Sequence, residues 1–329
     1  MRITILVCGF VSILAISIMI LSCSSSETES LMWDAENIGR SLDQKPFVPT
    51  ILNSNLGKGV NRISLGMFDD GQPIGGLEVE ARIFQLGENP ESNPSDAILI
   101  DQKFFNPVSL IPIGPHAHSN ESSHSHVHDG AEVTVYIAYF DFVNSGRWGL
   151  ALNVIDTKND EVYEDLQISL FVHERTSEPQ LGEIPPASLQ ALVSDVNNIS
   201  EIDSSLSPNP DLHNMTIKEA IELPQPTLVA FVTPGFCQTK FCAPTMEYVV
   251  NPLYEKYGNK INFVHIEPFD LKRARSGEGL FPTKVVTEWN LLSEPFIFLL
   301  NVKGEVSAKF EGIMSLQEVE LELEKLLFN

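Results

Sequence analysis

The spacing of apolar residues changes once along this chain of 329 residues, and the change separates two regions of different fold class. Over residues 47–175 the apolar residues alternate with polar ones or form short runs between turn-forming residues. Over residues 213–329 strand-like runs alternate with segments of helical period. Prolines such as Pro185 and Pro186 interrupt residues 176–212, which we therefore expect to be a linker. The sequence predicts a multidomain protein, an all-β domain followed by an α/β domain.

Six runs in the first region have the length and alternation of β-strands. They are Asn61–Phe68, Leu77–Leu86, Ala97–Phe105, Ala131–Phe142, Trp148–Ile155 and Leu166–His173. In one of them Trp148, Leu150 and Leu152 fall on one face, as in a strand that faces a core. No helical period occurs between the runs, so we predict an antiparallel β-sandwich. In this pattern the region resembles the immunoglobulin-like accessory domains of exported bacterial proteins.

Residues 1–23 have the pattern of an export signal. Arg2 precedes an apolar run that ends in Leu21-Ser22-Cys23, and this order is typical of secretory signals. The cysteine makes the segment resemble a bacterial lipoprotein signal, in which Cys23 would be acylated. The alternative is an uncleaved anchor helix, because about 20 apolar residues can span a bilayer. Either case predicts a protein held at the cell membrane by a lipid or a helix, with a polar tether over residues 24–46 and its body on the extracytoplasmic side.

The charge of the chain limits its partners. There are 21 Lys and Arg residues against 44 Asp and Glu residues, a formal net charge of -23. A nucleic acid must be met by a basic face, so we do not expect nucleic acid as a partner. The same charge disfavours adsorption of the protein surface to an anionic membrane.

Two cysteines remain once the N-terminal segment is set aside. Cys8 lies in the signal and Cys23 would carry lipid, which leaves Cys237 and Cys242 in a compartment where disulfides persist. Cys237 follows a buried strand at the point where a helix should begin, and amide groups and the helix dipole stabilise a thiolate there. The pair is either a redox couple or a structural disulfide. We favour the redox couple, because so short a loop stabilises a fold by only about 2 kcal/mol.

The order of elements around this pair resembles the thioredoxin fold over about residues 213–328. Ser293-Glu294-Pro295 stands directly before an apolar strand, and a hairpin and a last helix follow. The resemblance implies thiol–disulfide exchange with exported thiol or disulfide proteins and no required cofactor. It also implies that Cys237 attacks, that Cys242 resolves the mixed disulfide, and that Pro295 is cis and lies against the cysteines.

The sequence departs from the thioredoxin pattern in three respects. Four residues separate the cysteines instead of two, the strand before them has no aspartate, and Phe236 replaces the usual tryptophan. A five-residue step along a helix rises about 7.5 Å, whereas a disulfide needs Cα atoms within about 7 Å of each other. Cys237 must therefore precede the helix, or the first turn must unwind when the bond forms.

Two other functions stay open for the pair. The four-residue spacing and Thr233-Pro234-Gly235 resemble one branch of the peroxiredoxins, but Phe236 shifts the threonine that would orient peroxide out of register. A non-catalytic binding protein with a permanent disulfide is the other alternative.

Five of the eight histidines lie in one loop of the β region: His116, His118, His124, His126 and His128. Alternate histidines in an extended segment suit Cu(II) or Zn(II), so this loop is a candidate site for weak metal binding. The alternative is a solvated loop whose histidines bind nothing specific. With the cysteine pair it resembles copper-delivery factors for cytochrome oxidase. A copper-binding, metallochaperone-like lipoprotein is therefore a second hypothesis. We expect His265 in the core and His213 in the linker.

Overall fold

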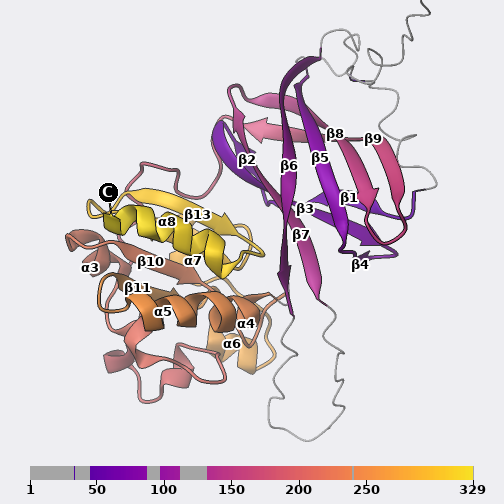
Figure 1. Cartoon of the computed structure of the whole chain (residues 1–329). Helices are drawn as coiled ribbons and strands as arrows, with labels where there is room; N and C mark the ends of the chain where they lie inside the picture. The colour runs from indigo at the N-terminus through magenta and orange to yellow at the C-terminus, as the bar shows by residue number, and fades with distance from the viewer. Residues whose placement is uncertain (1–32, 34–44, 87–96, 112–131, 239–240, 329) are drawn as a thin grey trace, which may run out of the picture.

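The computed structural model describes residue 33 and residues 45–86, 97–111, 132–238 and 241–328. The predicted signal segment, Cys23, nearly all of the predicted tether and the five loop histidines lie outside these residues. The described part of the chain forms a β unit and an α/β unit that lie side by side (Figure 1). No helix within it is long and apolar enough to cross a membrane.

The first unit is built from strands, and each of the six predicted runs overlaps one of them. The strands are β1 (Val48–Ile51), β2 (Leu56–Gly57), β3 (Gly59–Asp69), β4 (Gln72–Pro73), β5 (Leu77–Gln85), β6 (Ile98–Leu110), β7 (Val133–Phe142), β8 (Gly146–Asp156) and β9 (Glu161–His173). They hydrogen-bond in the order β1-β3-β7-β6-β5-β8-β9-β2, with β4 beside β3.

Two features of this unit differ from the predicted antiparallel sandwich. The long strand β6 pairs with β5 through its first half and with β7 through its second half, so the described strands form one continuous sheet. The last pair, β2 with β9, is parallel, whereas the other pairs are antiparallel. The chain passes directly from β2 into β3, and these strands stand near opposite ends of the strand order, so the two ends of the sheet lie close together.

The core of the β unit forms from the alternating faces of these strands. Trp148, Leu150 and Leu152 are fully buried in one cluster, which confirms the predicted inward face of β8. The Trp148 ring packs edge-on against Phe142, with 4.9 Å between ring centroids. Its Nε1 donates a hydrogen bond to the carbonyl of Asn144, so the indole is buried without losing its polar contact.

The second unit has the element order that the thioredoxin resemblance predicted. Its elements are α3 (Ile217–Glu222), β10 (Thr227–Phe231), α4 (Cys242–Thr245), a π-helical segment η5 (Met246–Val250), α5 (Asn251–Tyr257), β11 (Asn262–Ile266), α6 (Leu271–Arg275), α7 (Lys284–Trp289), β12 (Phe296–Leu300), β13 (Val306–Glu311) and α8 (Leu316–Phe328). The sheet order is β11-β10-β12-β13, in which only β10 and β11 are parallel.

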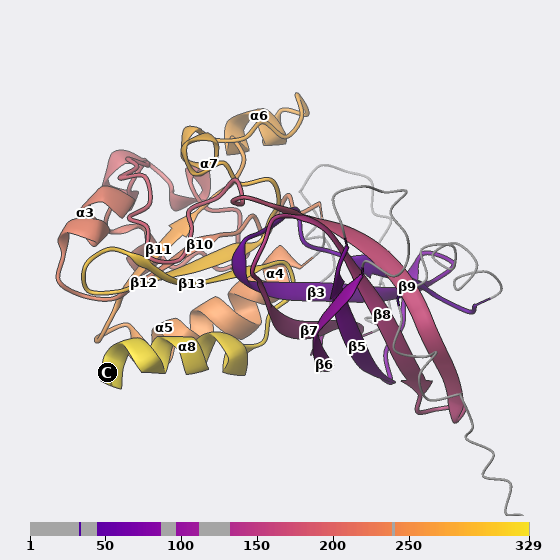
Figure 2. The ribbon, with the colours of Figure 1, turned by 90° about the horizontal axis from the view of Figure 1, so that it is seen from above.

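Helices cover both faces of this sheet (Figure 2). One apolar cluster joins β10 to the run from α4 to α5 and to α8, and another joins the opposite face to α3 and α7. Both central strands are buried along their whole length, which explains their continuous apolar sequences.

The last helix, α8, is capped at its start and bound through two of its acidic residues. Ser315 accepts a hydrogen bond from the Glu318 amide and so caps α8. Glu318 binds Arg62 of the β unit, and Glu320 accepts hydrogen bonds from Lys256 and Tyr257.

The segment expected to be a linker runs along the α/β unit. Gly182 and Glu183 exchange backbone hydrogen bonds with Val306 at the start of β13. Three short 3₁₀ helices follow: η2 (Val193–Asp195), η3 (Ile199–Glu201) and η4 (Pro210–His213). The segment thus adds a packed layer to the second unit.

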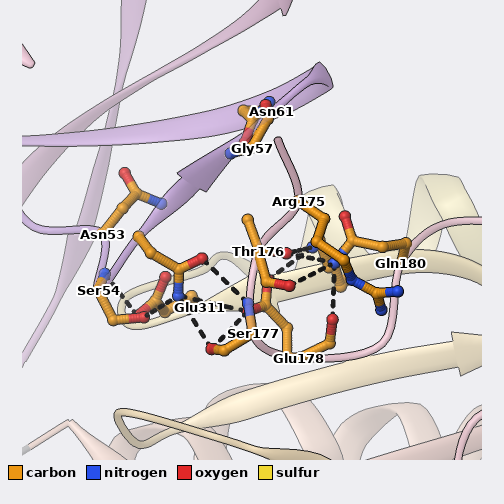
Figure 3. A network of polar contacts seen from close by, with 12 residues as sticks. Asn53, Ser54, Gly57, Asn61, Arg175, Thr176, Ser177, Glu178, Gln180 and Glu311 are labelled. Carbon is orange, nitrogen blue, oxygen red and sulfur yellow. Dashed lines mark hydrogen bonds and ion pairs between the residues drawn. The ribbon is translucent and has the colours of Figure 1, made fainter. Parts of the chain in front are cut away.

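A polar network joins the two units where this segment leaves the β unit (Figure 3). The Ser54 amide donates to the Glu311 carboxylate at 2.9 Å, and the Asn55 amide group donates to Ser177 and Glu178. Lys309 binds Glu178 at 2.6 Å, with both side chains mostly buried. The orientation of the units is therefore set by specific contacts.

Candidate redox site

The cysteine pair lies where β10 leaves the sheet and a helix begins. β10 ends at Phe231, a turn follows, and α4 begins at Cys242 with Phe241 as its N-cap residue. Cys237 lies in the turn, before the helix. Of the two arrangements that the five-residue spacing allowed, the structure therefore has the one in which the first cysteine precedes the helix.

No disulfide bond joins the two cysteines, and they differ in exposure. Their sulfur atoms lie 2.6 Å apart, and the Cys242 amide donates a hydrogen bond to the Cys237 sulfur at 3.1 Å. Cys242 is fully buried, whereas Cys237 is partly exposed. An amide that points at the outer sulfur stabilises a thiolate there, while the inner sulfur is reached only after the outer one.

Glu294 is a residue of this site that the sequence analysis did not select. Its Oε1 accepts a hydrogen bond from the Gln238 amide at 3.1 Å, and a carboxylate oxygen and both sulfur atoms lie within 4.8 Å of one another. The antiparallel pairing of β10 with β12 places Phe231 opposite Phe296, so the residues after β10 meet those before β12. An acidic residue directly before an apolar strand was the signal in the sequence.

Burial shifts the proton affinity of this group of residues. Burial raises the pKa of Glu294 to about 7. The hydrogen bond from the Gln238 amide lowers this pKa, and the charge on Cys237 raises it. Burial also raises the pKa of the Cys242 thiol well above its usual value, and the neighbouring Cys237 acts in the same direction. The site thus holds a thiol that keeps its proton beside a carboxyl group that titrates near neutral pH.

Pro295 occupies the position that the resemblance predicted. The Glu294–Pro295 peptide bond is cis, and the Pro295 carbonyl accepts a hydrogen bond from the Gly312 amide. Because Pro295 follows Glu294 directly, it lies at the edge of the cysteine site.

A second group of polar residues lies elsewhere in the α/β unit. Asp203, His213 and His265 are buried and place their side-chain donor atoms within 4.8 Å of one another. His265 is in the core, as expected, and His213 ends η4 as a buried residue. Two groups of described residues could therefore hold a metal ion, this one and Cys237, Cys242 and Glu294.

Comparison with solved structures yields a neighbour that is similar to part of the chain. No family model matches the chain, and no curated protein matches it. A candidate thioredoxin from Neisseria meningitidis, solved in solution, is 25% identical, with 39% of this chain and 93% of that chain covered and a TM-score of 0.26. The chain is thus similar in part to a protein described as a thioredoxin.

Proposed function

We propose that this protein is a membrane-anchored, extracytoplasmic thiol–disulfide exchange protein that acts through Cys237 and Cys242. The observation that carries the proposal is the asymmetry of the pair. The Cys237 sulfur is partly exposed and accepts a hydrogen bond from the Cys242 amide. The Cys242 thiol beside it is buried at the start of α4. A structural disulfide needs neither the difference in exposure nor the neighbouring carboxyl group.

In the reducing direction the chemistry runs in two steps. The Cys237 thiolate attacks a disulfide of an exported protein, forms a mixed disulfide and releases one substrate sulfur as a thiolate. Cys242 then loses its proton and attacks the Cys237 sulfur, which forms the Cys237–Cys242 disulfide and releases the second substrate sulfur. Two electrons pass to the substrate, and the reverse sequence oxidises a dithiol.

Glu294 supplies the proton handling in this proposal. The strand before the cysteines, β10, has no aspartate that could take up a proton. It consists of Thr227 and four apolar residues. The Glu294 carboxylate lies within 4.8 Å of the Cys242 sulfur and so can accept its proton as that sulfur attacks. Pro295 would shape the surface that meets the substrate.

The anchoring part of the proposal rests on the sequence of the first 23 residues. A lipid on Cys23, or an anchor helix, would hold the body at the cell membrane, where partners would be exported proteins with thiols or disulfides.

A redox titration of the full chain in mild detergent tests the exchange function. The thiols are trapped with an alkylating agent at each potential and counted by mass. We expect a reversible transition between about -120 and -270 mV, the range of dedicated exchange catalysts. A pair that stays oxidised below about -300 mV would be structural and would refute the proposal. The Cys242→Ser variant should instead accumulate a mixed disulfide at Cys237.

Copper binding by the same residues is a second candidate, favoured by the three donors within 4.8 Å of one another. Two thiolates and a carboxylate suit Cu(I) through their sulfur atoms. The reduced chain would then retain one copper ion through gel filtration, and Cys237→Ser would lose it. Retention that is the same in the wild type and in Cys237→Ser would exclude this function.

A further inference from the structure

Asp203, His213 and His265 form a compact group that the exchange chemistry does not use. The residues come from the segment after η3, from the end of η4 and from β11, and each is at most 2% exposed. Histidine and aspartate side chains are rarely buried together without a partner of opposite charge or a metal ion.

The three donor atoms converge on one point. The Asp203 Oδ2 lies 3.0 Å from the His213 Nε2 and 3.4 Å from the His265 Nδ1. In a tetrahedral zinc site, metal–ligand distances of 2.0 to 2.2 Å place the donors about 3.3 Å apart. The two separations from Asp203 lie near that value, and the two histidine nitrogens lie within 4.8 Å of each other.

The hydrogen bonding of His265 leaves one nitrogen turned toward the carboxylate. Its Nε2 lies 2.8 Å from the Val232 carbonyl and so carries the hydrogen that it donates. Its Nδ1 faces the Asp203 carboxylate at 3.4 Å, and it is among the buried atoms of the described chain that make no hydrogen bond. A histidine that binds a metal through one ring nitrogen usually donates a hydrogen bond from the other, often to a backbone carbonyl. A proton or a metal ion between the Nδ1 and the carboxylate oxygen would satisfy both atoms.

A cavity reaches the group from the outside. His213 and His265 belong to its lining, together with Glu267, Asp270 and residues of α6 such as Arg273. The two histidines therefore form part of the wall between this group and the cavity.

We propose that Asp203, His213 and His265 bind one divalent transition-metal ion, with zinc as the best fit to two imidazoles and one carboxylate. The ion would fasten the segment that contains Asp203 to β11. The next residue, Ser204, donates its amide to Glu267 at 2.6 Å and accepts a hydrogen bond from the Gly235 amide at 2.8 Å. The metal would thus support the turn that carries Cys237, whether or not the cysteines exchange disulfides.

Cobalt(II) titration of the full chain in detergent tests the site. The chain is stripped with a chelator and oxidised first, so that Cys237 and Cys242 are silent as ligands. The five loop histidines are replaced by glutamine to remove their contribution. We expect one equivalent of Co(II) with the intense visible bands of a four- or five-coordinate site, no sulfur-to-cobalt band, and displacement by one equivalent of zinc.

Single variants of this loop-substituted chain assign the ligands. His213→Gln and Asp203→Asn should lose the visible bands, whereas His173→Gln, an exposed histidine of β9, should keep them. Bands that persist in His213→Gln would overturn the assignment. Absence of the bands from the loop-substituted parent would also overturn it. The group would then be an ion pair between Asp203 and a protonated histidine.

The parent measurement does not depend on the folding of any ligand variant. Zinc should in addition raise the melting midpoint of the loop-substituted parent, because a ligand that binds only the folded state stabilises it. An unchanged midpoint at saturating zinc would contradict the proposal.

Discussion

Arg62 in β3 and Glu318 in α8 form an ion pair with two parallel contacts, although 256 residues separate them in the chain. The Nε–Oε1 distance is 2.7 Å and the Nη2–Oε2 distance is 2.8 Å. Arg62 also donates to the Glu311 and Ile313 carbonyls, at 3.1 and 2.7 Å. A planar guanidinium that binds a carboxylate in this way fixes direction as well as distance. The pair therefore holds the β unit against the α/β unit.

Replacement of Arg62 by alanine should destabilise the chain by about 3 kcal/mol, because it leaves a largely buried carboxylate without its cationic partner and two carbonyls without this donor. The side chains of Arg62 and Glu318 are only 5% and 15% exposed. Urea denaturation provides the measurement. Lys58→Ala is the matched control, since its pair with Glu174 is exposed and screened by solvent, and its loss should cost far less. Equal losses in the two variants would show that Arg62 does not join the units.

The turn that contains Cys237 and leads into α4 contacts the β unit through Phe241, the residue before Cys242. Phe241 packs against a cluster that contains Leu110, Val135 and Ile137 of the β unit and Ile313 of the other unit. We expect Phe241→Ala to speed alkylation of Cys242 several-fold in the reduced chain, because the start of α4 loses this support, whereas Phe241→Leu should change it little. Ile313→Ala should act in the same direction. Its effect should not add fully to that of Phe241→Ala, since the two side chains share one cluster.

The two cysteines should differ in reactivity toward iodoacetamide. Cys242 is buried and its pKa is raised, so its thiol stays protonated at pH 8. In the reduced chain we expect Cys237 to be modified at least about tenfold faster, because only the thiolate reacts. Peptide mass mapping over time measures both rates, and Cys237→Ser serves to observe Cys242 alone. Similar rates for the two thiols would contradict the assignment of attacking and resolving roles.

Glu294 should give the reduced chain a pH-dependent stability. Its pKa is about 7 in the folded chain and near 4.5 when the carboxyl group is exposed, so folding favours the protonated form. That contribution is complete below about pH 4.5 and is lost as the pH rises through 7. Between pH 5 and pH 8 the wild type should therefore lose about 2 kcal/mol relative to Glu294→Gln, after allowance for solvent screening.

Urea denaturation at the two pH values measures this difference. Glu278→Gln is the control, because Ser276 and Arg273 lower the pKa of Glu278 and reverse the sign of its contribution. A wild type and a Glu294→Gln variant with parallel pH profiles would show that Glu294 does not titrate near neutrality.

Most elements could be predicted from the sequence because their signals are local. Alternation over eight to ten residues marks β8, the apolar run Thr227–Phe231 marks β10, and Ser315 marks the start of α8. The position of Cys237 after a buried strand likewise needs only neighbouring residues. These features follow from the spacing of apolar residues and from helix caps, which a few neighbouring residues determine.

Tertiary structure alone decided which distant residues meet. Glu294 reaches the cysteines because β12 pairs antiparallel with β10, and no local pattern specifies that pairing. Asp203, His213 and His265 come together only when the segment before α3 packs across β11. The same holds for Arg62 and Glu318, since an acidic helix face looks solvated until a partner from another unit covers it. Which remote segments pair and pack together depends on the whole core. The spacing of residues within one segment does not specify these contacts.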